Sequence, residues 1–318
     1  MAILIGIDEA GYGPHLGPMV VSAAACATSD PDVDLWEALR DVVSRRPAKD
    51  GRIPVADSKR LYHPELGLRP LEEAALPFLC CLGLPRPVGF ESFCNFLTGP
   101  PGEKRTVAPW YQNAPLMVPT VVPIEDLTRT THRLRMSLAH AGITIAAARS
   151  RMADPDAFNA GVRQTGNKSE FLFACFGEIV GDIRRAFPGD DLVFFVGKHG
   201  GKTFYQRNLQ SLFLSRPLSV ERETRRQSTY RIDDEGRAIT IHFLMDGEDR
   251  HFLIALASCV SKYLRELGMS LFNRYWQQHV PGLRPTAGYG TDARRFLRAI
   301  RSHAAALRIG EETLVRGC

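Results

Sequence analysis

A short apolar segment that ends on two adjacent acids constrains the fold of this chain most. Residues 2–7 read Ala-Ile-Leu-Ile-Gly-Ile, and Asp8 and Glu9 follow directly. An apolar run of this length beside a glycine-rich turn is typical of a strand that is buried on both faces of a sheet. Neighbouring strand residues point to opposite faces, so the two carboxylates can converge only where the strand ends or bulges. The segment therefore predicts a sheet with an acidic pair at its edge.

Further strands are interspersed with helices along the chain. Apolar runs predict strands at 18–25 and 192–196 and a hairpin at 227–245. The spacing of apolar residues predicts helices over 32–46, 127–150, 168–187, 250–278 and 291–307. Such a mixture indicates an α/β sheet protein with a helical C-terminal part, 250–318. We expect one domain over 1–318, with a proline-containing insertion or small subdomain at 84–126. Trp110 is interpreted as a buried anchor of that segment, with base stacking as the alternative.

Composition excludes several classes of protein. The 318 residues are 44% hydrophobic and 24% charged, as in globular chains, and no apolar run reaches the ~18–20 residues of a membrane span. Asp8 and Glu9 interrupt the apolar N-terminal segment, so no secretion signal is recognised and a cytoplasmic protein without membrane contact is expected. The seven cysteines form no CxxC pair and are expected mainly in the core. A net charge of +5 is compatible with a polyanionic partner. We expect a monomer.

Two acidic clusters are candidates for metal binding. Asp8 and Glu9 stand beside a glycine-rich turn, and carboxylate oxygens suit Mg²⁺ or Mn²⁺. A solvated acid pair is the alternative interpretation. The second cluster, 246–249, follows a predicted strand and precedes a predicted helix. Acids are also favoured at helix N-termini, so metal binding and helix capping both remain open for this cluster.

Basic side chains in several predicted loops could contact phosphates. Ser58 and Lys59 lie in a polar loop, Lys198 follows a predicted strand beside a Gly-Gly pair, and Lys262 lies on the long predicted helix. Each is individually more typical of a solvated surface. Together with a carboxylate metal site they favour a nucleic-acid backbone as the binding partner.

Four segments, in this order, resemble the motifs of type 2 ribonucleases H (ribonuclease HII). They are 6–14 (Gly-Ile-Asp-Glu-Ala-Gly-Tyr-Gly-Pro) continuing to 21, 57–59 (Asp-Ser-Lys), 254–266 with its Ala-Ser and lysine, and 287–291 (Ala-Gly-Tyr-Gly-Thr). The resemblance implies a ribonuclease-H-like mixed sheet flanked by helices, with a helical C-terminal part. It also implies four acids that hold two divalent cations, Mg²⁺ or Mn²⁺, around a scissile phosphate.

The resemblance assigns roles residue by residue. Asp8 and Glu9 match the first two acids, and the last acid is Glu248, or Asp249 if the spacing shifts by one residue. Gly11, Tyr12 and Gly13 match the turn that senses a ribose 2′-hydroxyl. Ser58, Lys59 and Lys262 would contact the nucleic-acid backbone. Tyr289 matches a tyrosine that stacks near the RNA–DNA junction. Lys198 is added to this set from its position in the predicted loop.

Two departures from the family pattern affect the expected activity. Tyr12 stands where the family has arginine, which puts the sensing of the 2′-hydroxyl in doubt, and Gly197 stands where the third acid is expected. The sequence predicts a metal-dependent endonuclease that hydrolyses RNA in RNA–DNA hybrids or at ribonucleotides embedded in DNA, with activity impaired at Gly197. The alternative is a catalytically inactive nucleic-acid-binding protein of the same fold.

Overall fold

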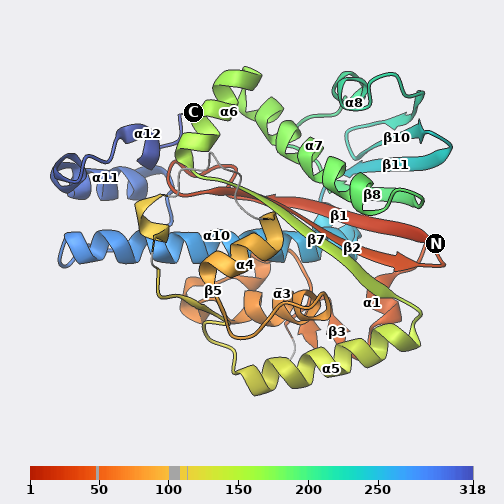
Figure 1. Cartoon of the computed structure of the whole chain (residues 1–318), viewed down its shortest axis with the longest axis horizontal. Helices are drawn as coiled ribbons and strands as arrows, with labels where there is room; N and C mark the ends of the chain where they lie inside the picture. The colour runs from red at the N-terminus through yellow and green to blue at the C-terminus, as the bar shows by residue number, and fades with distance from the viewer. Residues whose placement is uncertain (48–49, 100–107, 113, 318) are drawn as a thin grey trace.

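The computed structural model describes residues 1–47, 50–99, 108–112 and 114–317 (Figure 1). Within these ranges a seven-stranded sheet forms the centre of the molecule, in the order β7-β2-β1-β8-β11-β10-β9. Its strands are β1 (Ala2–Ala10), β2 (Met19–Thr28), β7 (Thr144–Ala153), β8 (Asp191–Gly197), β9 (Leu218–Glu223), β10 (Gln227–Asp234) and β11 (Arg237–Leu244). Strands β1, β8 and β11 run parallel, and the other neighbours pair antiparallel. The expected mixed sheet is confirmed.

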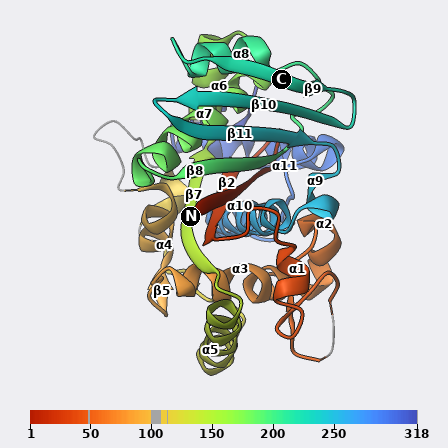
Figure 2. The ribbon, with the colours of Figure 1, turned by 90° about the vertical axis from the view of Figure 1, so that its right-hand side faces the viewer.

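Helices cover both faces of the sheet (Figure 2). One face carries α6 (Pro155–Thr165), α7 (Lys168–Ala186) and α8 (Gln206–Leu212), and the other carries α3 (Arg69–Cys81), α4 (Phe90–Thr98), α5 (Ile124–His140) and α10 (Phe252–His279). At one end lie α11 (Gly290–Ala306) and α12 (Glu311–Leu314). The short elements are α1 (Leu35–Ala38), α2 (Ser58–Leu61), α9 (Gly247–Arg250), β3 (Val43–Ser44), β4 (Ile53–Pro54), β5 (Val88–Gly89), β6 (Met117–Val118) and 3₁₀ turns at Pro64–Leu66 and Pro109–Tyr111. The helical C-terminal part is confirmed.

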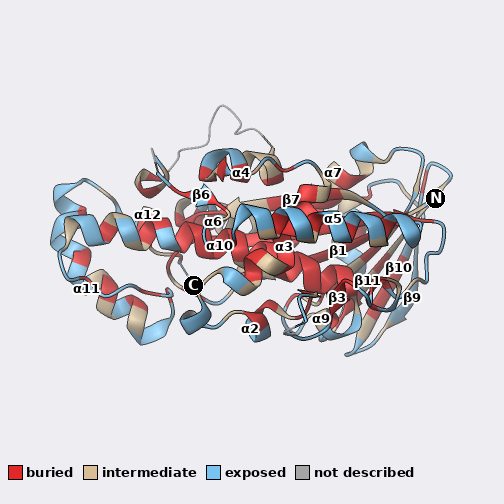
Figure 3. Ribbon diagram, turned by 90° about the horizontal axis from the view of Figure 1, so that it is seen from below, coloured by how far each residue is buried: buried red, intermediate tan, exposed pale blue. Residues whose placement is uncertain are grey.

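Burial follows this layered arrangement. Figure 3 shows buried residues concentrated on α10, α3 and the strands between the helical layers, and exposed residues along α5 and α11. Five of the cysteines are buried, as expected, whereas Cys318 lies outside the described residues. In the part of the chain that the structure describes, we find no helix with the length and apolar character needed to cross a membrane.

Two predicted helices are wrong in part. In the segment 32–46 only α1 is helical and Val43–Ser44 forms β3, because Trp36 and Leu39 turn into the core and the Trp36 indole donates to the Val55 carbonyl at 2.9 Å. The segment 127–150 divides at Gly142, whose left-handed φ of +66° ends α5, and its second half forms β7. Its alanine-rich sequence fits a helix or a buried strand equally well, so pairing with β2 decides the outcome.

A close approach between β1 and α10 places the end of β1 above the helix. A Cβ atom added to Gly6 would lie 2.0 Å from the backbone carbon of Leu253, so this contact requires glycine. About two turns further along α10, the Ser261 hydroxyl donates to the Asp8 carbonyl at 2.9 Å. These two contacts with α10 therefore fix the position of Asp8 and Glu9 at the end of β1.

The 84–126 segment packs against α3 and α10. Trp110 is buried and meets the Phe272 ring edge-on, with the centroids 4.9 Å apart. The Tyr111 hydroxyl donates to Asp154 at 2.8 Å. These contacts confirm the expectation that Trp110 is an anchor. Residues 100–107 and 113 lie outside the description, and the interpretation of 84–126 as an insertion stays a prediction.

The carboxylate of Glu72 joins this segment to the core. It is fully buried and accepts hydrogen bonds from the backbone amides of residues 120–122, from the Thr120 hydroxyl and from the Tyr263 hydroxyl at 2.8 Å. A buried carboxylate is tolerated when donors satisfy its oxygens in this way. Glu72 therefore links α3, the loop before α5, and α10.

We expect Glu72→Gln to lower the free energy of unfolding by about 1–3 kcal/mol, because the new amide NH₂ would face two backbone N–H donors. Urea unfolding followed by circular dichroism measures this change. Glu73→Gln is the matched control on the same helix, since Glu73 pairs with Arg69 near the surface and such pairs contribute at most ~1 kcal/mol. Equal effects of the two substitutions would contradict the assignment.

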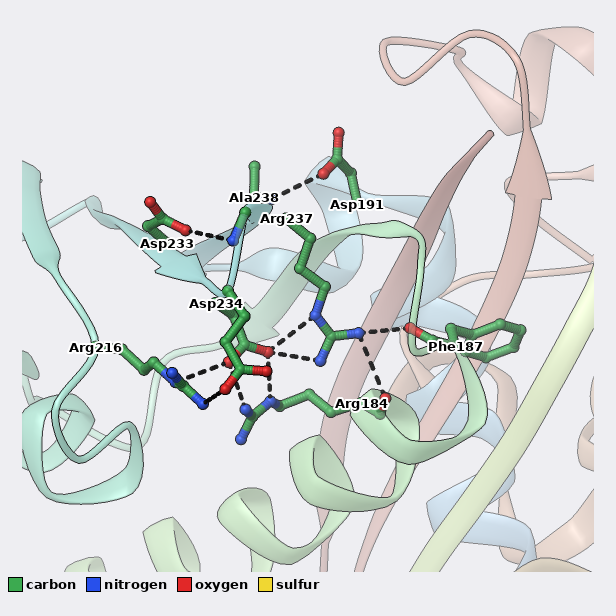
Figure 4. A network of polar contacts seen from close by, with 10 residues as sticks. Arg184, Phe187, Asp191, Arg216, Asp233, Asp234, Arg237 and Ala238 are labelled. Carbon is green, nitrogen blue, oxygen red and sulfur yellow. Dashed lines mark hydrogen bonds and ion pairs between the residues drawn. The ribbon is translucent and has the colours of Figure 1, made fainter.

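A buried cluster of ion pairs lies beside the turn between β10 and β11 (Figure 4). Asp234 is 4% exposed and contacts Arg184, Arg216 and Arg237. Burial raises the pKa of Asp234, but hydrogen bonds from Arg184 and Arg237 outweigh it, so the pKa lies below its ordinary value. Arg237 also donates to the Phe187 carbonyl at 2.5 Å. This cluster fastens the β10–β11 hairpin to α7 and has a structural role.

Candidate active site

Three parallel strands end at the same edge of the sheet and bring distant acids there. The pairing of β1 with β8 ends at Ile7 and Val196, and the pairing of β8 with β11 ends at Gly197 and Leu244. Asp8 and Glu9 follow the part of β1 that pairs with β8 and still pair with β2. Glu248 follows β11 after a turn at Asp246. Because carboxyl ends of parallel strands meet at one edge, these acids come from both sides of β8.

The electrostatics of the three acids show that they interact. Burial raises the pKa of Asp8 well above its ordinary value, and the charges of Glu9 and Glu248 raise it further. Burial also raises the pKa of Glu9 to about 7, with Glu248 adding to the effect. The pKa of Glu248 is raised mainly by burial. Like charges held together out of water are costly, and such clusters are frequent at functional sites.

A lysine and two serines lie beside the acids. The Lys59 ammonium lies 3.8 Å from a carboxylate oxygen of Glu248, and its charge lowers the pKa of Asp8 and of Glu9. Ser58 begins α2, whose N-terminus is capped by Asp57. The Ser258 hydroxyl of α10 donates to the Ser58 hydroxyl at 2.8 Å. The loop at 57–59 is thereby fastened to the helix beneath the acidic pair.

Asp249 points elsewhere. Its two carboxylate oxygens accept from the Arg60 guanidinium at 2.6 and 2.7 Å, at the surface. Its charge raises the pKa of Glu248. The pKa values of Asp8 and Glu9 are raised instead by burial and by other carboxylates. This placement favours Glu248 over Asp249 as the last acid, the one that joins Asp8 and Glu9, and the catalytic assignment of each stays a prediction.

Gly197 lies directly beside Asp8. A Cβ atom added to Gly197 would lie 2.5 Å from Oδ1 of Asp8, so any side chain at 197 would enter the acidic cluster. A Cβ atom at Gly247 would lie 3.6 Å from the Cα of Gly197. The end of β8 and the start of α9 therefore approach each other through glycines, and the space of a side chain at 197 is taken by the Asp8 carboxylate.

The donor chemistry of this cluster suits a hard divalent cation, because it offers carboxylate oxygens in a buried setting with raised pKa values. As the side chains lie, the described residues contain no group of three or more His, Cys, Asp or Glu that could hold a metal ion. The three acids therefore lie at one edge of the sheet without forming a ready cation site among the described residues. Asp8, Glu9 and Glu248 are the residues that would hold the ion.

The glycine turn after β1 lies against the turn that carries Tyr289. The backbone amides of His15 and Leu16 donate to the Gly288 carbonyl at 2.8 and 3.2 Å. A Cβ atom at Gly13 would lie 3.8 Å from the Tyr289 ring. Tyr289 is 48% exposed, so its ring is available to a ligand. Gly13 and Tyr289, which the sequence assigned to substrate binding, thus lie together.

The remaining predicted binding residues have local partners. Tyr12 lies beneath the Lys168 ammonium, which is 4.1 Å from the ring centroid, and burial followed by the charge of Glu9 raises its pKa. Lys198 donates to the Thr224 carbonyl at 2.7 Å and to the Ser228 hydroxyl at 3.1 Å. These contacts direct Lys198 toward the β9–β10 turn.

Lys262 pairs with Glu266 at 2.8 Å, and its ammonium lies 4.6 Å from the Tyr62 ring centroid. The same part of α10 carries Arg265, which the sequence reasoning passed over although it lies within the 254–266 motif. Arg265 is 1% exposed and contacts both turns of the site. A buried arginine cannot be recognised from spacing alone, because the contacts that bury it come from two separate turns, one of which contains Gly11 at the other end of the chain.

Comparisons with known proteins were made over the whole chain. No protein-family model matches it, and no curated protein matches it. Solved structures similar to it include ribonuclease HII of Archaeoglobus fulgidus in a complex with PCNA, at 17% identity and a TM-score of 0.47, covering 99% of this chain and 93% of that one. Ribonuclease H2 from Pyrococcus horikoshii OT3 is similar at 12% identity and a TM-score of 0.48, over 98% and 92%.

A third similar structure is Bst-RNase HIII in complex with Mn²⁺, at 14% identity and a TM-score of 0.43, covering 99% of this chain and 66% of that one. These structural neighbours are ribonucleases of types HII and HIII, the kind that the sequence motifs resemble. Every TM-score here lies below 0.5, so the fold class rests on the sheet order and strand directions described above.

Proposed function

We propose that this protein is a divalent-metal-dependent endoribonuclease of the ribonuclease HII kind, which hydrolyses the RNA strand of RNA–DNA hybrids or cleaves at ribonucleotides embedded in DNA. One observation carries the proposal. Asp8 and Glu9, and Glu248 about 240 residues later, lie at the edge where β1, β8 and β11 end, and the charge of Glu248 raises the pKa of both Asp8 and Glu9. The four segments that resemble the family's motifs all contribute residues to this edge or its surroundings.

The residues around the acids support a nucleic-acid substrate. Lys59 stands beside Glu248 with its side chain 80% exposed, so its ammonium can contact a phosphate while it partly neutralises the acids. Tyr289 presents an exposed ring on which a nucleobase could stack. The adjoining glycine turn allows a ribose or phosphate to approach the backbone closely. Together these groups suit a backbone held by charge and a base held by stacking.

When bound, a divalent cation would polarise the scissile phosphate and lower the pKa of a water nucleophile. Asp8, Glu9 and Glu248 would hold it, and their raised pKa values mean that the cation competes with protons for these oxygens. Lys59 would orient the phosphate, and the hydrogen bond from Ser261 to the Asp8 carbonyl keeps the end of β1 in place.

Gly197 favours a second candidate function. A nuclease with a reduced set of acids would be weakened, whereas a protein that only binds hybrids needs no carboxylate at this position. The second candidate is therefore a nucleic-acid-binding protein in which the acids no longer support hydrolysis.

A panel of duplexes tests the proposal. The chain is incubated with an RNA–DNA hybrid, a DNA duplex that contains one ribonucleotide, an all-DNA duplex and an all-RNA duplex, each with Mg²⁺, Mn²⁺ or a chelator. We expect cleavage only of the two substrates that contain RNA opposite DNA, and only with metal. The position of the cut, read on a sequencing gel, distinguishes hydrolysis within an RNA tract from hydrolysis at a single ribonucleotide.

The other outcomes separate the alternatives. Binding of the hybrid without cleavage under every metal condition would support the binding protein. Cleavage of the all-DNA duplex at a similar rate would contradict selection for ribose and would trace to Tyr12 in the sensing turn. If the chain neither binds nor cleaves the hybrid, the proposed function is refuted.

A further inference from the structure

Arg265 of α10 is a buried cation between the two turns of the candidate active site. Its Nη1 lies 2.7 Å from a Glu266 carboxylate oxygen, and its Nη2 donates to the Ala287 carbonyl at 3.1 Å. Ala287 is two residues before Tyr289 in the same turn. A fully buried arginine is rare and requires partners, and one partner here belongs to the turn that carries the exposed tyrosine.

The guanidinium also faces the aromatic ring. Its central carbon lies 5.7 Å from the centroid of the Tyr289 ring, within the range of a cation–π contact. Arg265 is 1% exposed and Tyr289 is 48% exposed. The cation therefore contacts the ring from the protein side, while about half of the tyrosine remains open to a ligand.

The other turn is shaped around the same side chain. A Cβ atom at Gly11 would lie 2.6 Å from Nε and 2.7 Å from Cδ of Arg265, and Gly11 has a left-handed φ of +82°. Both the conformation and the contact require glycine. Nε of Arg265 is buried and finds no hydrogen-bond acceptor among the described residues. An unsatisfied buried donor is costly, and its retention calls for a compensating role.

We propose that Arg265 is a positioning residue that fixes the Tyr289 ring against the Gly11–Gly13 turn, so that the ring stands ready to stack on a nucleobase of the bound hybrid. The inference rests on the proposed function and adds a residue to it. Arg265 touches no substrate, because it is buried. It acts through the turn at 287–289 and through the ring face, and it sets the distance between the ring and the turn that would contact the ribose.

Binding of a fluorescently labelled RNA–DNA hybrid, measured by anisotropy in chelator, tests this inference without requiring hydrolysis. We expect Tyr289→Leu to weaken binding by about 10- to 100-fold and Arg265→Met by about 10-fold. Arg265→Lys keeps the charge but loses the two-pronged hydrogen bonding, so it should weaken binding by only a few fold. The double substitution Arg265→Met with Tyr289→Leu should bind no more weakly than Tyr289→Leu alone, because Arg265 acts through the ring.

Arg295→Met is the matched control. Arg295 fastens the preceding part of the same loop, donating to the carbonyls of Arg284 and Pro285 at 3.1 and 2.9 Å, without contact to Tyr289 or Gly11. It should lower the melting temperature and leave hybrid binding within about twofold. If Arg265→Met does not fold, Arg265→Lys is compared with Arg295→Met instead. Only Arg265→Lys should then weaken binding of the hybrid.

Two results would overturn the inference while leaving the proposed function intact: additive losses in the double variant, or equal losses of binding in the Arg295 and Arg265 variants. Failure of the wild-type chain to bind any hybrid would instead refute the proposed function, and the positioning role would fall with it. The two failures are therefore distinguishable in one experiment.

Discussion

Replacing Gly197 by aspartate is expected to raise metal-dependent cleavage of an RNA–DNA hybrid by about 100-fold or more over the wild-type chain. Position 197 is the end of β8, between the strand that carries Asp8 and the one that leads to Glu248. A side chain there enters the acidic cluster, because its Cβ atom would lie 2.5 Å from Oδ1 of Asp8. A single well-placed catalytic group is often worth about 10²- to 10³-fold in rate. Initial rates with Mg²⁺ and Mn²⁺ measure the effect.

The same substitution should destabilise the protein when metal is absent. The new carboxylate would join acids whose pKa values are already raised by burial and by one another, and the Asp8 side chain would have to rotate away. We therefore expect a lower melting temperature than wild type in chelator, and a larger increase when Mg²⁺ or Mn²⁺ is added, since a ligand that binds only the folded state stabilises it.

Gly197→Asn separates charge from size. The amide has nearly the shape of the carboxylate but is a poorer ligand for a hard cation, so this variant should show the steric cost without the gain in cleavage or metal-dependent stability. Equal activity of the Asn and Asp variants would contradict the role of a third acid at 197. So would a wild-type chain that cleaves as fast as Gly197→Asp.

Much of the sheet could be predicted because its strands are long, apolar and bounded by turns. The run that ends at Asp8 forms β1, and the run at 192–196 forms β8. The helix predicted at 32–46 failed because periodicity does not report the tertiary contacts that direct Trp36 into the core. Local pattern and tertiary packing compete in such short segments, and packing decides.

The candidate site was predictable as a set of segments but not as a geometry. Strand order brings the ends of β1 and β11 to either side of β8, which no local pattern reveals. The choice between Glu248 and Asp249 depends on the short α9, which begins after Asp246 adopts a left-handed φ of +51°. That turn directs one acid toward Lys59 and the other toward Arg60.

Glu9→Gln, made in the Gly197→Asp background to give a measurable rate, is expected to reduce cleavage by about 10²- to 10⁴-fold. The substitution keeps the size of the side chain and removes a charged oxygen ligand. Hybrid binding in chelator should be retained or improved, because one negative charge near the phosphate is removed. A rate that stays within about threefold would contradict a ligand role for Glu9.

Loss of the same charge should stabilise the metal-free protein, with a defined pH dependence. The pKa of Glu9 is about 7 in the folded protein against an ordinary value of 4.5, raised by burial and by Glu248. The unfolded chain therefore releases this proton first, so Glu9 makes the wild type progressively less stable as pH rises from 4.5 to about 7. The difference between Glu9→Gln and wild type should grow over that interval and then level off, at about 1–3 kcal/mol.

Urea unfolding at several pH values in chelator measures this difference, with both chains otherwise wild type. Glu37→Gln serves as the control, because Glu37 lies at the surface in a pair with Arg40 and its loss should change stability by less than ~1 kcal/mol. A Glu9 variant that is less stable than wild type at pH 8 would show that the carboxylate is held by favourable contacts. The cluster would then be a structural feature, and the raised pKa values of its acids would no longer argue for a bound cation.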